Sequence, residues 1–145
     1  YASSVASSTP RDELGQVVRI ERESGAASPV VNGVDALSVA VLRGGGRSWL
    51  YLGSAREGVV RAYELGADGA VVSEPRDVVS VRHDGAGADD RARRVVLEDG
   101  DLFVFASPFT FALRATGERE ETIYRYTWDV AAQAWAFAER RDRAP

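Results

Sequence analysis

Short runs of alternating apolar and polar residues, separated by glycine-rich turns, recur along this 145-residue chain. Two such runs, at 36–43 and 47–55, flank three consecutive glycines at 44–46. Alternation on both sides of a glycine turn is typical of a β-hairpin, because successive side chains of a strand point to opposite faces. The second run is apolar on both faces. We therefore expect an inner strand covered on both sides, with Trp49 and Tyr51 on one face and Leu50 and Leu52 on the other.

Turn signals divide the rest of the chain in the same way. Asp-Gly pairs, which readily adopt the positive φ angles of tight turns, occur at 68–69 and 99–100, whereas residues 24–33 break the alternation. Further strands are predicted at 16–22, 59–65, 70–74, 77–83, 93–98, 101–107 and 109–115. The predicted class is all-β, with antiparallel four-stranded meanders repeated twice, arranged either as in a propeller or as a small barrel or sandwich.

The C-terminal segment fits two structures. Strands at 122–129 and 134–141 would form a last hairpin. Alternatively, Asp129 could cap an alanine-rich helix, with an apolar stripe of Val130, Ala134 and Phe137. We expect the hairpin and keep a short C-terminal helix as the alternative.

The order of these parts repeats along the chain. Three segments have counterparts in the second half: LSVAVLR (37–43) and RRVVLED (93–99), WLYLGS (49–54) and DLFVFAS (101–107), and VVRAYEL (59–65) and TIYRYTW (122–128). We therefore expect two repeat units, about residues 16–75 and 77–141, within a single β domain at 14–145. The second unit carries an insertion at 108–121.

The segment SVAVLRGGGRSWLYLGSAREGVVRAYELGADGAVV resembles one blade of a β-propeller, over about residues 36–74, and residues 93–140 resemble a second blade. The resemblance implies four-stranded sheets packed radially, each burying its face against the next. Propellers need at least four blades, which implies a longer protein, a ring closed by a homo-oligomer, or a barrel or sandwich instead. YRYTWDVAAQAW also resembles the aromatic strand and turn of small bacterial sugar-binding lectins with two blades per chain.

Charge and composition exclude several classes of protein. All 18 basic residues are arginine, a bias typical of GC-rich bacterial genomes, and the formal charge is -4 with acidic and basic residues interleaved. Nucleic acid is therefore not an expected partner, because it requires a net basic face. Without cysteine, thiolate metal sites, disulfides and cysteine nucleophiles are excluded. No apolar run approaches the ~20 residues of a membrane span.

The segment at 1–13, YASSVASSTPRDE, is rich in Ser, Ala, Thr and Pro. We expect it to be a flexible leader that follows a removed N-terminal segment, either a signal or a lipoprotein anchor. Anchoring to a membrane would then depend on that removed segment. This predicts an extracytoplasmic location: periplasmic, cell-surface or secreted.

No pattern of polar residues points to catalysis, a metal or a cofactor. His83 is the one histidine, and the G-x-S-x-G turn of serine hydrolases is absent. The acidic loop with Asp84, Asp89 and Asp90 lacks the spacing that wraps calcium. We expect no catalytic residues, no metal ligands and no cofactor. A hydrolase fragment that uses two of the 22 acidic residues stays as an alternative.

Aromatic residues form the strongest candidate binding site. Tyr124, Tyr126 and Trp128 share one face of a predicted strand, and Trp135 would join them from the other strand of the hairpin. These rings form either core or a platform for stacking sugars, with Arg125 and Arg114 as nearby donors. Phe109 and Phe111, within the insertion, are a candidate partner-binding loop.

The function expected from these features is a non-catalytic binding module that recognises a protein or another macromolecule outside the cytoplasm. A carbohydrate-binding, lectin-like module that uses the aromatic face is the alternative, and the hydrolase fragment is the second alternative.

Overall fold

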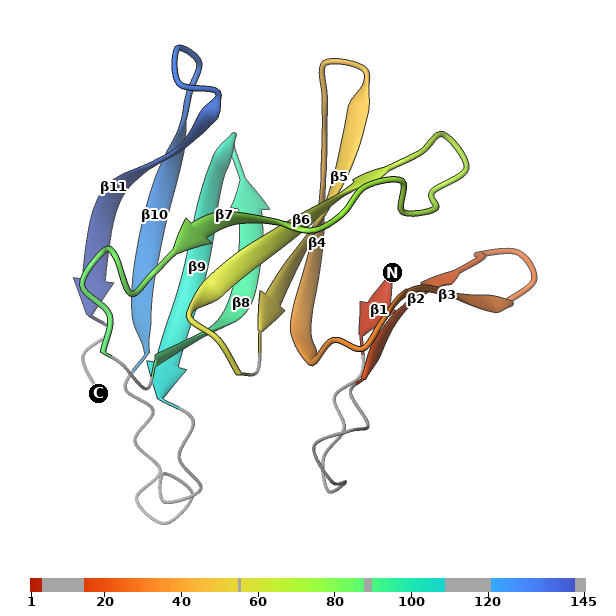
Figure 1. The fold of residues 1–145 in the computed structure, drawn as a ribbon, viewed down its shortest axis with the longest axis horizontal. Helices are drawn as coiled ribbons and strands as arrows, with labels where there is room; N and C mark the ends of the chain where they lie inside the picture. The colour runs from red at the N-terminus through yellow and green to blue at the C-terminus, as the bar shows by residue number, and fades with distance from the viewer. Residues whose placement is uncertain (4–14, 55, 88–89, 109–120, 143–145) are drawn as a thin grey trace.

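The computed structural model describes residues 1–3, 15–54, 56–87, 90–108 and 121–142, which form three antiparallel β-sheets (Figure 1). The N-terminal sheet contains β1 (Ala2–Ser3), β2 (Gln16–Ile20) and β3 (Ala27–Asn32). The middle sheet contains β4 (Ala36–Gly44), β5 (Arg47–Ser54), β6 (Val59–Leu65) and β7 (Arg76–Ser80). The C-terminal sheet contains β8 (Asp90–Glu98), β9 (Asp101–Pro108), β10 (Thr122–Asp129) and β11 (Ala134–Asp142).

Both four-stranded sheets are simple meanders, in which each strand pairs with its neighbours in sequence. The middle sheet lies between the other two, as Figure 1 shows, and a separate apolar core fills each interface. The all-β class and the repeated four-stranded meander are thereby confirmed, in a sandwich-like layering of sheets. Within the described residues no helix is long and apolar enough to cross a bilayer.

Strand β5 is covered on both faces, as its sequence predicts. Leu50 and Leu52 pack into the core shared with the N-terminal sheet. Trp49 and Tyr51 face the C-terminal sheet and belong to the other core. An apolar pattern on both faces of a strand is what a sheet with packed neighbours on either side requires.

The two meanders repeat in register as well as in order. Leu50 lies opposite Tyr63 in the middle sheet, and Leu102 lies opposite Tyr126 in the C-terminal sheet. In each sheet this Leu–Tyr pair faces the sheet that precedes it in the chain. Both sheets also carry a β-bulge near the start of their first strand. Equivalent residues can therefore be matched between the sheets.

A glycine allows the two meanders to approach closely. A Cβ atom at Gly53 would lie 2.9 Å from the carbonyl oxygen of Arg93 and 3.0 Å from that of Ala92, both in β8. Next to this contact, the backbone N–H of Val95 donates to the hydroxyl of Ser38, at 2.9 Å. The backbone of β8 thus lies directly against β5 at Gly53. A larger residue at this position would separate the two sheets.

The expected C-terminal hairpin is confirmed, and the alternative of a short C-terminal helix is wrong, because 134–142 form strand β11 and pair with β10. Asp129 does accept a hydrogen bond from the backbone of Ala132, at 3.0 Å, but this bond closes a turn. Gln133 then adopts a positive φ of 51°, which ends any helical path and returns the chain antiparallel to β10.

The segment predicted as a strand at 70–74 contributes a single bridge, between Leu65 and Val71. The backbone N–H of Glu64 donates to the hydroxyl of Ser73 instead of a backbone carbonyl, at 2.9 Å. Pro75 has no N–H to donate. Regular pairing with β6 therefore begins at Arg76, and β7 belongs to the middle sheet.

Two further differences concern the N-terminal half and the insertion. Strand β3 lies in the segment 24–33, where the alternation breaks, because Pro29 falls at a bulge in its pairing with β2. Ala2 and Ser3, within the expected leader, pair with β2 as strand β1. Residues 4–13 of that segment and the strand predicted at 109–115 lie outside the described residues.

Candidate functional site

A groove of about 940 Å³ lies between the middle and C-terminal sheets. It opens among the turns that join β4 to β5, β8 to β9 and β10 to β11. In Figure 1 the hairpin tips of β4–β5 and β10–β11 both lie at the top of the view. The aromatic, charged and amide side chains in its wall are Arg47, Trp49, Tyr51, Arg76, Asp77, Trp128, Gln133 and Trp135.

Two pairs of rings come from opposite sheets. Trp49 and Tyr51 alternate along β5, so both point toward the C-terminal sheet. Trp128 and Trp135 are cross-strand partners that flank the β10–β11 turn. Their rings meet edge to face, with centroids 5.3 Å apart and planes at 77°. Trp128 remains 41% exposed, so part of its surface is open to a ligand.

A hydrogen bond joins the two pairs across the groove. The indole Nε1–H of Trp135 donates to the hydroxyl of Tyr51 at 3.1 Å, and the two rings meet edge to face at 6.4 Å. Burial raises the pKa of Tyr51, against the smaller opposing effects of this bond and of Arg76. The phenol is therefore neutral around pH 7. The hydrogen bond and the ring contact fix the orientation of Trp135 at the floor of the groove.

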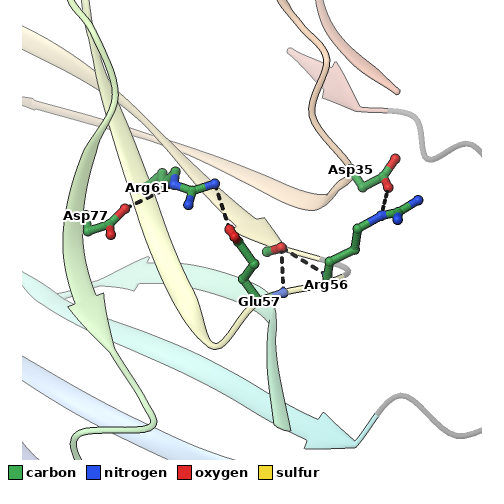
Figure 2. A network of polar contacts seen from close by, with 6 residues as sticks. Asp35, Arg56, Glu57, Arg61 and Asp77 are labelled. Atoms are coloured by element: carbon green, nitrogen blue, oxygen red, sulfur yellow. Dashed lines mark hydrogen bonds and ion pairs between the residues drawn. The ribbon is translucent and has the colours of Figure 1, made fainter. Parts of the chain in front are cut away.

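Charged residues line the wall formed by β7. The guanidinium carbon of Arg76 lies 4.8 Å from the centroid of Trp49, a cation–π contact. Asp77 instead accepts a hydrogen bond from Arg61 Nε at 3.0 Å. Figure 2 shows Arg61 reaching Asp77 with one part of its guanidinium and Glu57 with another, at 2.7 Å. The carboxylate of Asp77 is thus already paired.

The five residues predicted to bind a ligand separate into three locations. Trp128 and Trp135 line the groove. Tyr124 and Tyr126 are buried in the core between the sheets, at 0% and 2% exposure. Arg125 lies on the outer face of the C-terminal sheet, where it pairs with Asp101 at 3.1 Å and Glu139 at 3.7 Å. The structure thus brings together only the two tryptophans.

The buried Tyr126 has structural partners. The hydroxyl of Tyr126 donates to Asp84 Oδ2 at 2.7 Å. Burial, this hydrogen bond and the charge of Asp84 all raise the pKa of Tyr126. Phe137 packs edge to face on Tyr126, with ring centroids 6.0 Å apart. Tyr126 therefore ties the hairpin of β10 and β11 to the loop that follows β7.

Sequence reasoning did not assign Trp49, Tyr51 and Arg76 to a site. The alternation in β5 does place Trp49 and Tyr51 on one face, and that signal is visible in the sequence. Their meeting with Trp128 and Trp135 depends on packing between two sheets, which one strand's pattern does not encode.

The polar candidate His83 does not line the groove. His83 is exposed in the turn that follows β7. Among the described residues, no group of three or more His, Asp or Glu side chains is arranged to hold a metal ion.

Gly45 and Gly46 have positive φ angles of 59° and 75°, as the predicted hairpin turn requires. Phe109, Phe111 and Arg114 lie outside the described residues.

No protein-family model, curated protein or solved structure matches this chain.

Proposed function

We propose that this protein is a non-catalytic carbohydrate-binding module whose ligand occupies the groove between the middle and C-terminal sheets. The proposal rests on one observation, the four aromatic rings from two sheets that line a single open groove: Trp49, Tyr51, Trp128 and Trp135. Sugar rings present flat C–H faces that pack on aromatic side chains, and their hydroxyl groups need polar partners at the rim.

The dimensions and lining of the groove support a ligand of one or a few sugar units. Its volume of about 940 Å³ falls within the range of about 300–1,000 Å³ found for small-molecule sites. Arg76 and Gln133 supply hydrogen-bond donors beside the rings. A wall that combines aromatic rings with charged and amide side chains is the composition expected of a site that recognises orientation as well as shape.

The distribution of acidic residues supports binding without hydrolysis. Glycoside hydrolases place two carboxyl groups on either side of the scissile bond. Asp77 is the one carboxylate among the described residues of the groove wall, and Arg61 already binds it. The groove thus supports a lectin-like function better than that of a hydrolase fragment.

The test is a glycan array followed by calorimetric titration of the best ligands. We expect Trp128→Ala to weaken binding at least tenfold, about 1.4 kcal/mol, as for a central contact residue. Phe137→Ala is the matched control, because Phe137 is 47% exposed on the same hairpin but does not line the groove. Loss of binding in both variants, or in neither, would contradict the proposal.

We infer in addition that the sheets pack as blades of a propeller-like arrangement. The repeated meander and the Leu–Tyr pair that faces the preceding sheet in both copies support this inference. Copies of the chain could then close a ring as a homo-oligomer. Light scattering tests this closure: a discrete oligomer supports it, and a monomer at all concentrations contradicts it.

The ligand class also supports the extracytoplasmic location expected from the sequence, since polymeric glycans are found on cell surfaces and outside cells. Cell fractionation with an antibody against the protein tests this location, and recovery in the cytoplasmic fraction alone would contradict it.

A further inference from the structure

The groove contains a positive charge that no carboxylate of the described residues neutralises. Arg47, Arg76 and Asp77 are the charged residues among its described lining. Arg47 lies 3.7 Å from Glu64. Among the described residues, by contrast, no ion pair or hydrogen bond links Arg76 to an acidic group, and its recorded contact is the ring of Trp49.

The neighbouring carboxylate does not serve as a partner for Arg76. Asp77 follows Arg76 in β7 and could in principle neutralise it, but the two side chains alternate along the strand. Asp77 pairs with Arg61, and Figure 2 shows that Arg61 is in turn shared with Glu57. The carboxylate of Asp77 is therefore committed to Arg61, and the charge of Arg76 remains available.

The position of Arg76 suits a planar anion. A guanidinium holds its N–H groups in one plane, so two of them can donate in parallel to one carboxylate. The contact with Trp49, at 4.8 Å, restricts the side chain before a ligand arrives. Arg76 also acts electrostatically on the hydroxyl of Tyr51, so its charge reaches the floor of the groove.

We propose that the groove selects a carboxylate-bearing sugar, of the uronic acid class, in preference to its neutral counterpart. This inference rests on the proposed function, since it names the class of glycan that the same groove takes. The carboxylate accepts two hydrogen bonds from Arg76, and the sugar ring or its neighbour packs on Trp128. Arg76 thereby determines specificity, whereas the tryptophans provide affinity for any sugar of suitable shape.

The test uses pairs of ligands that differ only in charge. Hexamers of galacturonate, mannuronate and glucuronate-containing hyaluronan are titrated calorimetrically against the same hexamers as methyl esters. We expect the wild-type protein to bind the acid of at least one pair about tenfold or more tightly than its ester, since a hydrogen bond to a charged group has about that effect. Added salt should reduce the difference.

Variants separate this inference from the proposed function. Arg76→Ala should remove the preference for the acid while binding of the ester persists, and Arg76→Lys should restore only part of it because lysine lacks the planar fork. Arg94→Ala is the matched control. The guanidinium carbon of Arg94 also lies over an aromatic ring, that of Phe105, at 5.0 Å from its centroid, but on the outer face of the C-terminal sheet.

The outcomes are distinct. A preference that is lost in Arg76→Ala and kept in Arg94→Ala supports the inference. Equal binding of acid and ester, or a preference that survives in Arg76→Ala, overturns the inference, and Trp128→Ala then shows whether the groove still binds neutral sugars. If neither these hexamers nor any glycan of the array binds, the proposed function fails and the inference fails with it.

Discussion

Replacing Gly53 by alanine would place a methyl group where the backbone of β8 already lies. The new Cβ would be 2.9 Å and 3.0 Å from the carbonyl oxygens of Arg93 and Ala92, and 2.6 Å from the hydroxyl oxygen of Ser38. Two of these three neighbours are backbone atoms, which cannot rotate away. The clash is therefore relieved only if β8 moves away from β5, at the interface that joins the two meanders.

The magnitude follows from three contributions. Overpacking a filled site costs about 1–3 kcal/mol. Displacement of Ser38 weakens its hydrogen bond with Val95, which contributes about 0.5–1.5 kcal/mol. In the opposite direction, alanine restricts the unfolded chain and stabilises by about 0.4–1 kcal/mol, since Gly53 lies outside the positive-φ region. We expect a net loss of about 2 kcal/mol in the free energy of unfolding, from the sum of these ranges.

Urea unfolding and a thermal melt measure this loss. A change of about 2 kcal/mol corresponds to a decrease of roughly 4–8 °C in Tm for a chain of this size. Gly44→Ala is the control, because its Cβ would meet no atom within 4 Å and its φ is also not positive. Equal stability of the two variants, or a gain at Gly53, would show that the sheets do not approach as described.

Two further predictions concern buried polar groups. The side chain of Asp35 is about 1% exposed and pairs with Arg56, and it accepts a hydrogen bond from the backbone of Gly15 at 3.1 Å; Asp35→Ala should cost about 1–3 kcal/mol in urea unfolding, because a buried N–H is left unpaired. Asp77→Ala, which removes an exposed pair with Arg61, should cost under about 1 kcal/mol, and the reverse order would refute this ranking. The raised pKa of Tyr126, caused mainly by burial, means that the unfolded chain releases this proton first. Its contribution to stability is complete below about pH 10, the value for a free phenol, and is lost as the pH rises further; phenolate absorbance of Tyr126 that develops near pH 10 while the circular dichroism stays native would contradict this expectation, with Tyr126→Phe used to assign the signal.

Glycine turns and alternating apolar residues were sufficient to predict most of the strands. The triple glycine and the Asp-Gly pairs at 68–69 and 99–100 mark hairpin turns because the backbone there must adopt positive φ angles, and Gly45, Gly46, Gly69 and Gly100 do so. Strand β3 and the start of β7 were not predictable in this way. Their limits depend on Pro29 at a bulge and on the Ser73 hydroxyl, which replaces a backbone acceptor.

The extent of strand pairing decides which aromatic rings are buried in the core and which line the groove. Tyr124, Tyr126 and Trp128 share one face, and the sequence treats them alike. Strand β10 pairs with β9 only as far as Tyr126, which lies opposite Leu102. Trp128 extends beyond β9 into the hairpin with β11, so it is 41% exposed whereas Tyr126 is 2% exposed. The end of a strand pair is a property of the tertiary fold, which is why the pattern predicted the face and not the site.

The register of the repeat explains why, within the described residues, the middle sheet presents rings to the groove and the equivalent face of the C-terminal sheet does not. With Leu50 matched to Leu102, the position of Trp49 corresponds to Asp101 in the C-terminal sheet. Asp101 does not present a ring; it forms an ion pair with Arg125 on the outer face, at 3.1 Å. The Leu–Tyr pairs maintain the fold in both four-stranded sheets. The aromatic groove occurs where the sequences of these two sheets differ. An exchange of Trp49 for aspartate should therefore abolish glycan binding while the register set by Leu50 and Tyr63 persists, and unfolding of that variant would show that Trp49 serves the core instead.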